Sequence, residues 1–68
     1  MVNPLGILPP RAGAKWTVYH LNGADDEVNF AVDLPTEAAA QAAAVFIREN
    51  EARLSTAELH DEICRRWA

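Results

Sequence analysis

The chain has one cysteine, few aromatic residues and no long run of apolar residues. A single thiol, Cys64, cannot form an internal disulfide, so the cysteine content does not point to an oxidising compartment. The apolar residues near the N-terminus are interrupted by Pro4, Gly6 and Pro9 and follow no basic segment, so we expect neither a signal peptide nor a membrane span. The default expectation is a cytoplasmic protein.

Positive charge is also scarce. Six Lys and Arg residues stand against ten Asp and Glu residues, which gives a net charge of −4. An acidic chain without a basic stripe is not expected to bind nucleic acid or anionic lipid through general electrostatic attraction, but it suits a basic protein surface. The excess of alanine over other residues, and of arginine over lysine, is typical of a GC-rich bacterial or phage gene.

Three side chains could carry metal or nucleophile chemistry: His20, His60 and Cys64. His60 and Cys64 are four residues apart and would share a helix face, and His20 would supply a third zinc ligand. The alternative is a buried thiol beside a partly exposed imidazole, which we favour because no Cys-x-x-Cys pair accompanies these residues. Cys64 also falls near the end of a predicted helix, where the helix dipole disfavours a thiolate. We therefore predict no metal site, no cofactor and no enzymatic activity.

The middle of the chain predicts a β-hairpin. Residues 15–21 are β-branched and aromatic, residues 28–34 alternate between apolar and polar side chains, and Asn22-Gly23 lies in the turn between them. The alternation places Val28, Phe30, Val32 and Leu34 on one face of the second strand and Asn29, Ala31 and Asp33 on the other.

The C-terminal half predicts two helices. The first begins at Pro35 or Thr36 and is thin, because six alanines lie between positions 38 and 44. Asn50 falls within its apolar stripe, so this helix is expected to leave the core near Asn50. Ser55 and Glu58 have the spacing of a capping box, which predicts the start of a second helix over residues 56–67.

Residues 1–14 contain three of the four prolines and predict an extended N-terminal arm. The predicted fold is therefore α+β: a small single domain over residues 15–68, with an antiparallel β-hairpin followed by two α-helices (ββαα), preceded by the Pro-rich arm. An isolated two-stranded sheet is not stable in water. Either Leu5–Leu8 adds a third strand, or two hairpins pair across a homodimer, and the thin core favours a homodimer.

Two segments are candidates for binding a partner. Asp25, Asp26 and Glu27 are either solvated turn residues or an acidic knuckle that meets Lys and Arg side chains of another protein. In the arm, the apolar residues either cover a core of this chain or of a second copy, or they dock into a groove of a partner. The arm residues in question are Leu5, Ile7 and Leu8.

We expect a small non-enzymatic protein-binding module, namely a regulator, an adaptor or an inhibitor that occludes a basic surface. A nucleic-acid-handling machine has such a surface, and a phage origin would fit an inhibitor of one. One alternative is a DNA-binding accessory protein of a mobile element, although the predicted hairpin carries only one cation, Lys15. The other alternative is a structural subunit of a larger assembly.

Overall fold

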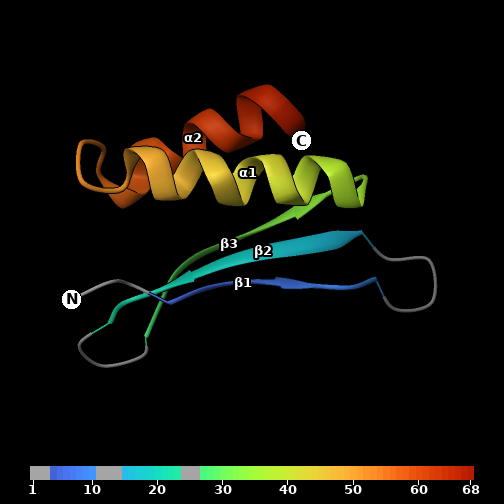
Figure 1. Cartoon of the computed structure of the whole chain (residues 1–68), viewed down its shortest axis with the longest axis horizontal. Helices are drawn as coiled ribbons and strands as arrows, with labels where there is room; N and C mark the ends of the chain where they lie inside the picture. Colours follow the sequence, from blue (N-terminus) through green and yellow to red (C-terminus); the bar gives the residue numbers. More distant parts are fainter. Residues whose placement is uncertain (1–3, 11–14, 24–26) are drawn as a thin grey trace.

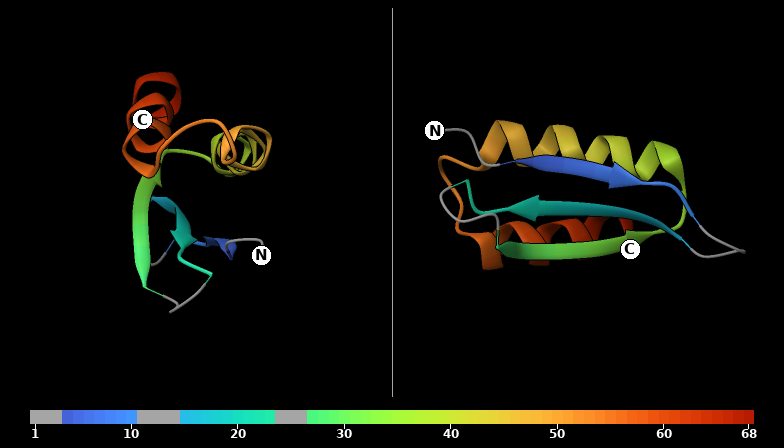
Figure 2. Two further views of the ribbon diagram at one scale, coloured as in Figure 1. Left: turned by 90° about the vertical axis from the view of Figure 1, so that its left-hand side faces the viewer. Right: turned by 90° about the horizontal axis from the view of Figure 1, so that it is seen from below.

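The computed structural model describes residues 4–10, 15–23 and 27–68, and these form a three-stranded antiparallel sheet followed by two helices (Figure 1). The elements, in chain order, are β1 (Leu5–Leu8), β2 (Trp16–Leu21), β3 (Val28–Leu34), α1 (Glu37–Asn50) and α2 (Thr56–Trp67). Both helices cover the same face of the sheet, with α1 over β1 and β2 and α2 over β3 (Figure 2). The α+β class and the order of hairpin and helices predicted from the sequence are confirmed.

The core lies between this face of the sheet and the two helices. Large apolar side chains enter it from β2, β3 and both helices, and α1 also contributes two alanines that let its backbone approach the sheet. The buried apolar residues are Val18, Phe30, Val32, Leu34, Ala40, Ala43, Phe46, Ile47, Leu59 and Ile63. Burial of these side chains is the main force that holds the helices on the sheet.

The N-terminal arm supplies the third strand. β1 pairs antiparallel with β2, with Leu5 opposite His20 and Leu8 opposite Thr17. Leu5 and Ile7 pack against the core, while Leu8 is 52% exposed. The hairpin is therefore completed by a third strand from the same chain, which was one of the two alternatives predicted above. The homodimer stays a prediction.

The opposite face of the sheet is covered by neither helix (Figure 1). On this face the ring of Tyr19 lies across Gly6, so closely that a Cβ atom at residue 6 would collide with it. Glycine at this position therefore lets an aromatic side chain lie flat on the neighbouring strand.

A β-bulge interrupts the pairing of β3 with β2. His20 is opposite Phe30 and Leu21 is opposite Val28, so Asn29 has no partner in β2. The extra residue shifts the alternation by one position. The prediction that Val28 shares the core face is consequently wrong: Val28 is 63% exposed and lies opposite Leu21.

The boundary between the helices is set by side-chain hydrogen bonds. At the end of α1, Asn50 donates its side-chain amide to the Phe46 carbonyl at 2.9 Å. At the start of α2, the Ser55 hydroxyl accepts from the Glu58 amide at 3.2 Å, and Glu58 Oε1 accepts from the Ser55 amide at 3.0 Å. The predicted capping box and both predicted helices are confirmed.

Ser55→Ala is expected to lower the free energy of unfolding by about 1 kcal/mol, because the Glu58 amide loses its acceptor. Chemical denaturation measures this loss as a lower midpoint with an unchanged slope. An unchanged midpoint would show that the cap adds nothing to stability.

The capping box also makes stability depend on pH. The Ser55 amide, and secondarily its hydroxyl, hold the pKa of Glu58 below its ordinary value. A lowered pKa in the folded state gives stabilisation that is present above the ordinary carboxyl range and is lost as the pH falls through the lowered pKa. Glu58→Gln removes this titration, so the acid side of its stability profile should be flatter than that of the wild type.

Candidate functional site

A groove of about 440 Å³ lies between β3 and the first turns of α2. Its β3 side is formed by Asn29, Phe30 and Ala31, and its α2 side by Thr56, Ala57, His60 and Asp61. These four helix positions share one face of α2 because they are one and four residues apart. The groove is open to solvent, since Ala31, Ala57 and Asp61 are all exposed.

The floor of the groove is an aromatic cluster. Phe30 is only 8% exposed, and its ring stacks on the His20 ring with the centroids 5.2 Å apart and the planes 18° apart. The His60 ring meets Phe30 edge-on, with the centroids 6.0 Å apart. Contacts of this kind fix ring positions in addition to burying area, so the floor of the groove is preformed.

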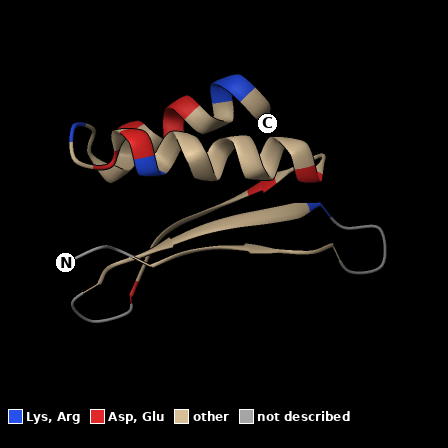
Figure 3. Ribbon diagram, viewed as in Figure 1, with Lys and Arg blue, Asp and Glu red and all other residues tan. Residues whose placement is uncertain are grey.

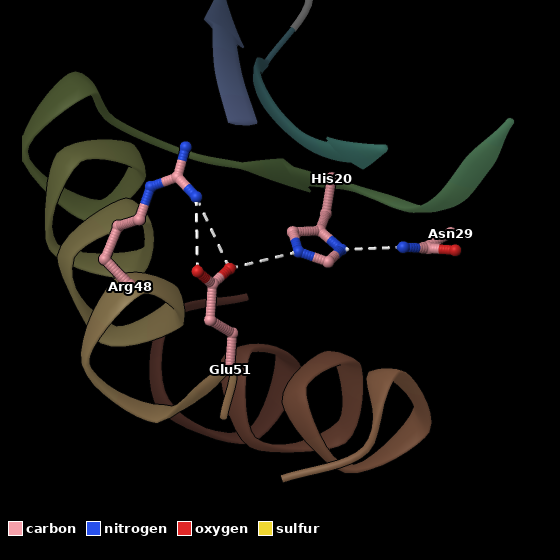
Figure 4. Close-up of polar contacts among 4 residues, drawn as sticks. All are labelled: His20, Asn29, Arg48 and Glu51. Carbon is pink, nitrogen blue, oxygen red and sulfur yellow. Dashed lines mark hydrogen bonds and ion pairs between the residues drawn. The ribbon is translucent and has the colours of Figure 1, made fainter. Parts of the chain in front are cut away.

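A polar network centred on the buried His20 holds this floor from below (Figure 4). His20 is 1% exposed, and its Nε2 atom lies 3.4 Å from Oε2 of Glu51, the residue that caps the C-terminus of α1. Its Nδ1 atom lies 3.1 Å from Nδ2 of Asn29. Arg48 Nη1 donates to both carboxylate oxygens of Glu51, at 3.3 and 3.4 Å.

The partners of His20 indicate its tautomer. A carboxylate only accepts hydrogen bonds, so Nε2–H donates to Glu51, and an amide nitrogen only donates, so Nδ1 accepts from Asn29. The imidazole therefore connects the bulge residue of β3 to the end of α1, and both of its nitrogens have partners.

His60 and Cys64 lie on one face of α2, as the spacing predicts, with Sγ 3.8 Å from Nε2. His60 Nδ1 lies 3.7 Å from Oδ1 of Asp61. The structure does not add His20 to this pair, because its two nitrogens face Glu51 and Asn29. Among the described residues no group of three or more His, Cys, Asp or Glu side chains is placed to hold a metal ion.

Of the residues predicted to bind a partner, the structure describes Leu5, Ile7, Leu8 and Glu27. Asp25 and Asp26 lie outside the described residues, while Glu27 is exposed and its carbonyl accepts from the Asn22 amide at 2.7 Å. Leu5 and Ile7 face the core, and Leu8 pairs near the start of β2 rather than near its end. Whether the acidic knuckle or the arm contacts a partner stays a prediction.

One carboxylate, that of Asp61, lies in the wall of the groove. β3 also carries the exposed Asp33, whose carboxylate accepts from the Thr17 hydroxyl at 2.7 Å, and it follows the exposed Glu27. The cations of α2, Arg65 and Arg66, lie in its last turn, away from the groove (Figure 3). No Lys or Arg is among the groove's lining residues.

Neither of the two helices in the described part of the chain has the length and hydropathy needed to cross a bilayer. Comparison of the chain with known protein families, with curated proteins and with solved structures found no match. The function must therefore be inferred from the residues of this chain.

Proposed function

We propose that the protein is a small non-enzymatic protein-binding module and that the groove between β3 and α2 is its binding site. The observation that supports this most is that the groove lies beside an edge of the sheet. In the order β1-β2-β3, the outer side of β3 has no strand neighbour among the described residues. Exposed strand edges with an adjacent groove are a recurrent way to bind segments of other proteins.

The two edges of the sheet differ in how well they are protected against pairing. β1 has four residues and is flanked by Pro4 and Pro9, and short edge strands with nearby prolines resist the addition of another strand. β3 has seven residues and contains no proline. Pairing with another chain is therefore easier at β3, which is the strand that borders the groove.

The charge of the groove favours a basic partner. A regulator, adaptor or inhibitor would act by covering a basic surface, and the acidic knuckle Asp25-Asp26-Glu27 would speed the encounter. Nucleic-acid-handling machines have basic surfaces. We therefore propose more specifically that the protein is a phage-encoded inhibitor of such a machine.

The alternatives have less support. A DNA reader needs cations on its strands or at a helix N-terminus, whereas Lys15 precedes β2 and the described residues of the three strands contain no Lys or Arg. A homodimer would use the open sheet face, where Leu8 and Val28 are exposed. Sedimentation equilibrium at micromolar concentration distinguishes a dimer from a monomer.

Affinity capture from the organism that encodes the chain, followed by quantitative mass spectrometry, tests the proposal. Ala57→Trp fills the groove, so a basic protein retained by the wild type should fall about tenfold or more, the loss expected for an occluded contact centre. Ala42→Trp, at an exposed site on α1, is the matched control and should retain that protein.

A second variant tests the acidic knuckle. Replacing Asp25, Asp26 and Glu27 together with serine should slow association with the captured protein, and the difference should shrink as salt rises.

Equal capture by the wild type and Ala57→Trp would reject the groove as the site. Recovery of nucleic acid instead of a protein would reject the proposed class.

A further inference from the structure

We infer that the groove receives an extended basic segment of the partner protein, which adds to β3 as a fourth strand. This inference rests on the proposed function and names the chemistry of the partner. It follows from three features of the described residues: the direction of the backbone groups of β3, the side chains of the facing wall of α2, and the sign of the surrounding charge.

The direction of the backbone groups follows from two hydrogen bonds of β2 and the turn after it. The Leu21 amide donates to the Pro4 carbonyl at 2.8 Å, on the β1 side. The next amide, that of Asn22, donates to the Glu27 carbonyl at 2.7 Å, on the β3 side. Amides of β2 therefore point alternately toward β1 and toward β3, as in any antiparallel strand.

This alternation identifies the outward groups of β3. The amide of His20, two residues before Asn22, points toward β3, and His20 is paired with Phe30. Phe30 therefore directs its backbone groups toward β2, and Ala31 and Asp33 direct theirs toward the open edge. Ala31 also lines the groove, so an added strand would exchange backbone hydrogen bonds at the same place where its side chains enter the groove.

The side chains of the groove suit an apolar residue and a basic residue on the same side of the added strand. Ala57 is small and the Phe30 ring lies at the floor, which leaves room for an aliphatic side chain, while Ala31 borders the groove through its backbone, because its side chain alternates with that of the buried Phe30. Asp61 is 79% exposed, so a Lys or Arg of the added segment can reach its carboxylate. Successive residues of a strand point to opposite sides, so the apolar residue and the basic residue that enter the groove are two positions apart.

The floor of the groove requires little rearrangement on binding. Asn29 and Phe30 are both fixed by the buried His20, through a hydrogen bond and a ring stack respectively. A preformed site avoids the cost of ordering its own residues when the ligand binds.

The carboxylates of β3 and α2 disfavour other occupants. A second copy of the chain, paired through its own β3, would bring a second Asp33 and a second Asp61 close to the first pair, and like charges in close pairs destabilise strand pairing. Phosphate groups of nucleic acid or lipid would meet the same repulsion. A basic protein segment is attracted by these same charges.

A library of random heptapeptides displayed on phage, selected against the full chain, tests the inference. We expect enriched sequences to hold an apolar residue and a Lys or Arg two positions apart, and their enrichment to disappear with Ala57→Trp. For a synthetic enriched peptide, Asp61→Asn should raise Kd about two- to fivefold, as for an exposed ion pair, and the effect should shrink at high salt. Glu49→Gln, an exposed carboxylate change on α1, should leave Kd unchanged.

Backbone N-methylation of the peptide distinguishes strand addition from binding by side chains alone. Methylation of the alternate amides that face β3 should raise Kd about tenfold or more, and methylation of the other set should have little effect. Binding of the unmodified peptide should slow hydrogen exchange of the Ala31 and Asp33 amides. Equal Kd values for both methylated peptides, or no protection of these two amides, would overturn strand addition.

The outcomes separate this inference from the proposed function. No enrichment relative to Ala57→Trp, or enriched peptides without basic residues, would overturn the inference, even where a whole protein is still captured through the groove. Enriched basic peptides that protect Ala31 and Asp33 would support it, and a failure to capture any protein would then count against the proposed function alone.

Discussion

His20→Ala is expected to lower the free energy of unfolding by about 2–4 kcal/mol, which is a large share of the stability of so small a domain. The substitution removes a side chain that is 1% exposed and leaves a cavity beneath Phe30. It also removes the partner of the Asn29 amide and one of the two partners of the Glu51 carboxylate, which is only 21% exposed and keeps its contact with Arg48. An unpaired polar group in such a position loses part of its hydration without compensation.

Chemical denaturation of His20→Ala measures this loss, and His60→Ala provides the matched control. His60 also contacts the Phe30 ring, but its side chain is 44% exposed, so its removal leaves no closed cavity. We expect His60→Ala to lower the free energy of unfolding by less than about 1 kcal/mol. Equal losses for the two variants would show that the buried network does not support the floor of the groove.

Ile63→Ala is expected to have a similarly large effect, about 2–5 kcal/mol. Ile63 is fully buried and, with Leu59, holds α2 on the sheet. Since α2 forms one wall of the groove, loosening this helix should also weaken the binding of enriched peptides. Circular dichroism during urea denaturation measures the free energy of unfolding. Titration of the folded variant with an enriched peptide measures the Kd of that peptide.

Val45→Ala is the control for this apolar truncation. Val45 lies on α1 and is 57% exposed, so shortening it removes little buried area, and alanine is the better helix former. We expect Val45→Ala to change the free energy of unfolding by no more than about 0.5 kcal/mol. A loss for Ile63→Ala no larger than that for Val45→Ala would contradict the assignment of α2 to the core.

The elements that the sequence predicts well are those specified by neighbouring residues. The capping box at Ser55 and Glu58 acts over four positions, so its helix start is visible without any tertiary structure. The hairpin also follows from local patterns. The sequence leaves the third strand at Leu5–Leu8 as one of two alternatives, because strand pairing joins segments whose proximity depends on the whole fold.

The bulge in β3 is invisible in the sequence for a related reason. Residues 28–34 alternate without interruption, and only the pairing with β2 shows that Asn29 is the extra residue. The position of His20 on the core face could be predicted from alternation, but its bond to Glu51 could not, since 31 residues separate the two. Polar networks across such separations depend on the packing of the helices.

The groove cannot be predicted from the sequence, because no single segment contains all of its residues. Ala31 and Ala57 are unremarkable in a chain rich in alanine, and Asp61 resembles any exposed helix carboxylate. These residues become a site only when α2 is placed along the edge of β3. The acidic knuckle and the arm can be identified as candidate binding segments from the sequence, because each is a contiguous run of similar residues.

The most direct test of the central claim is a chemical-shift map of the isotope-labelled full chain on addition of the captured partner. If the groove is the binding site, the amides that shift most should cluster at 29–33 of β3 and 56–61 of α2. A cluster on the open face of the sheet instead, around Leu8, Tyr19 and Val28, with the groove amides unchanged, would contradict the account.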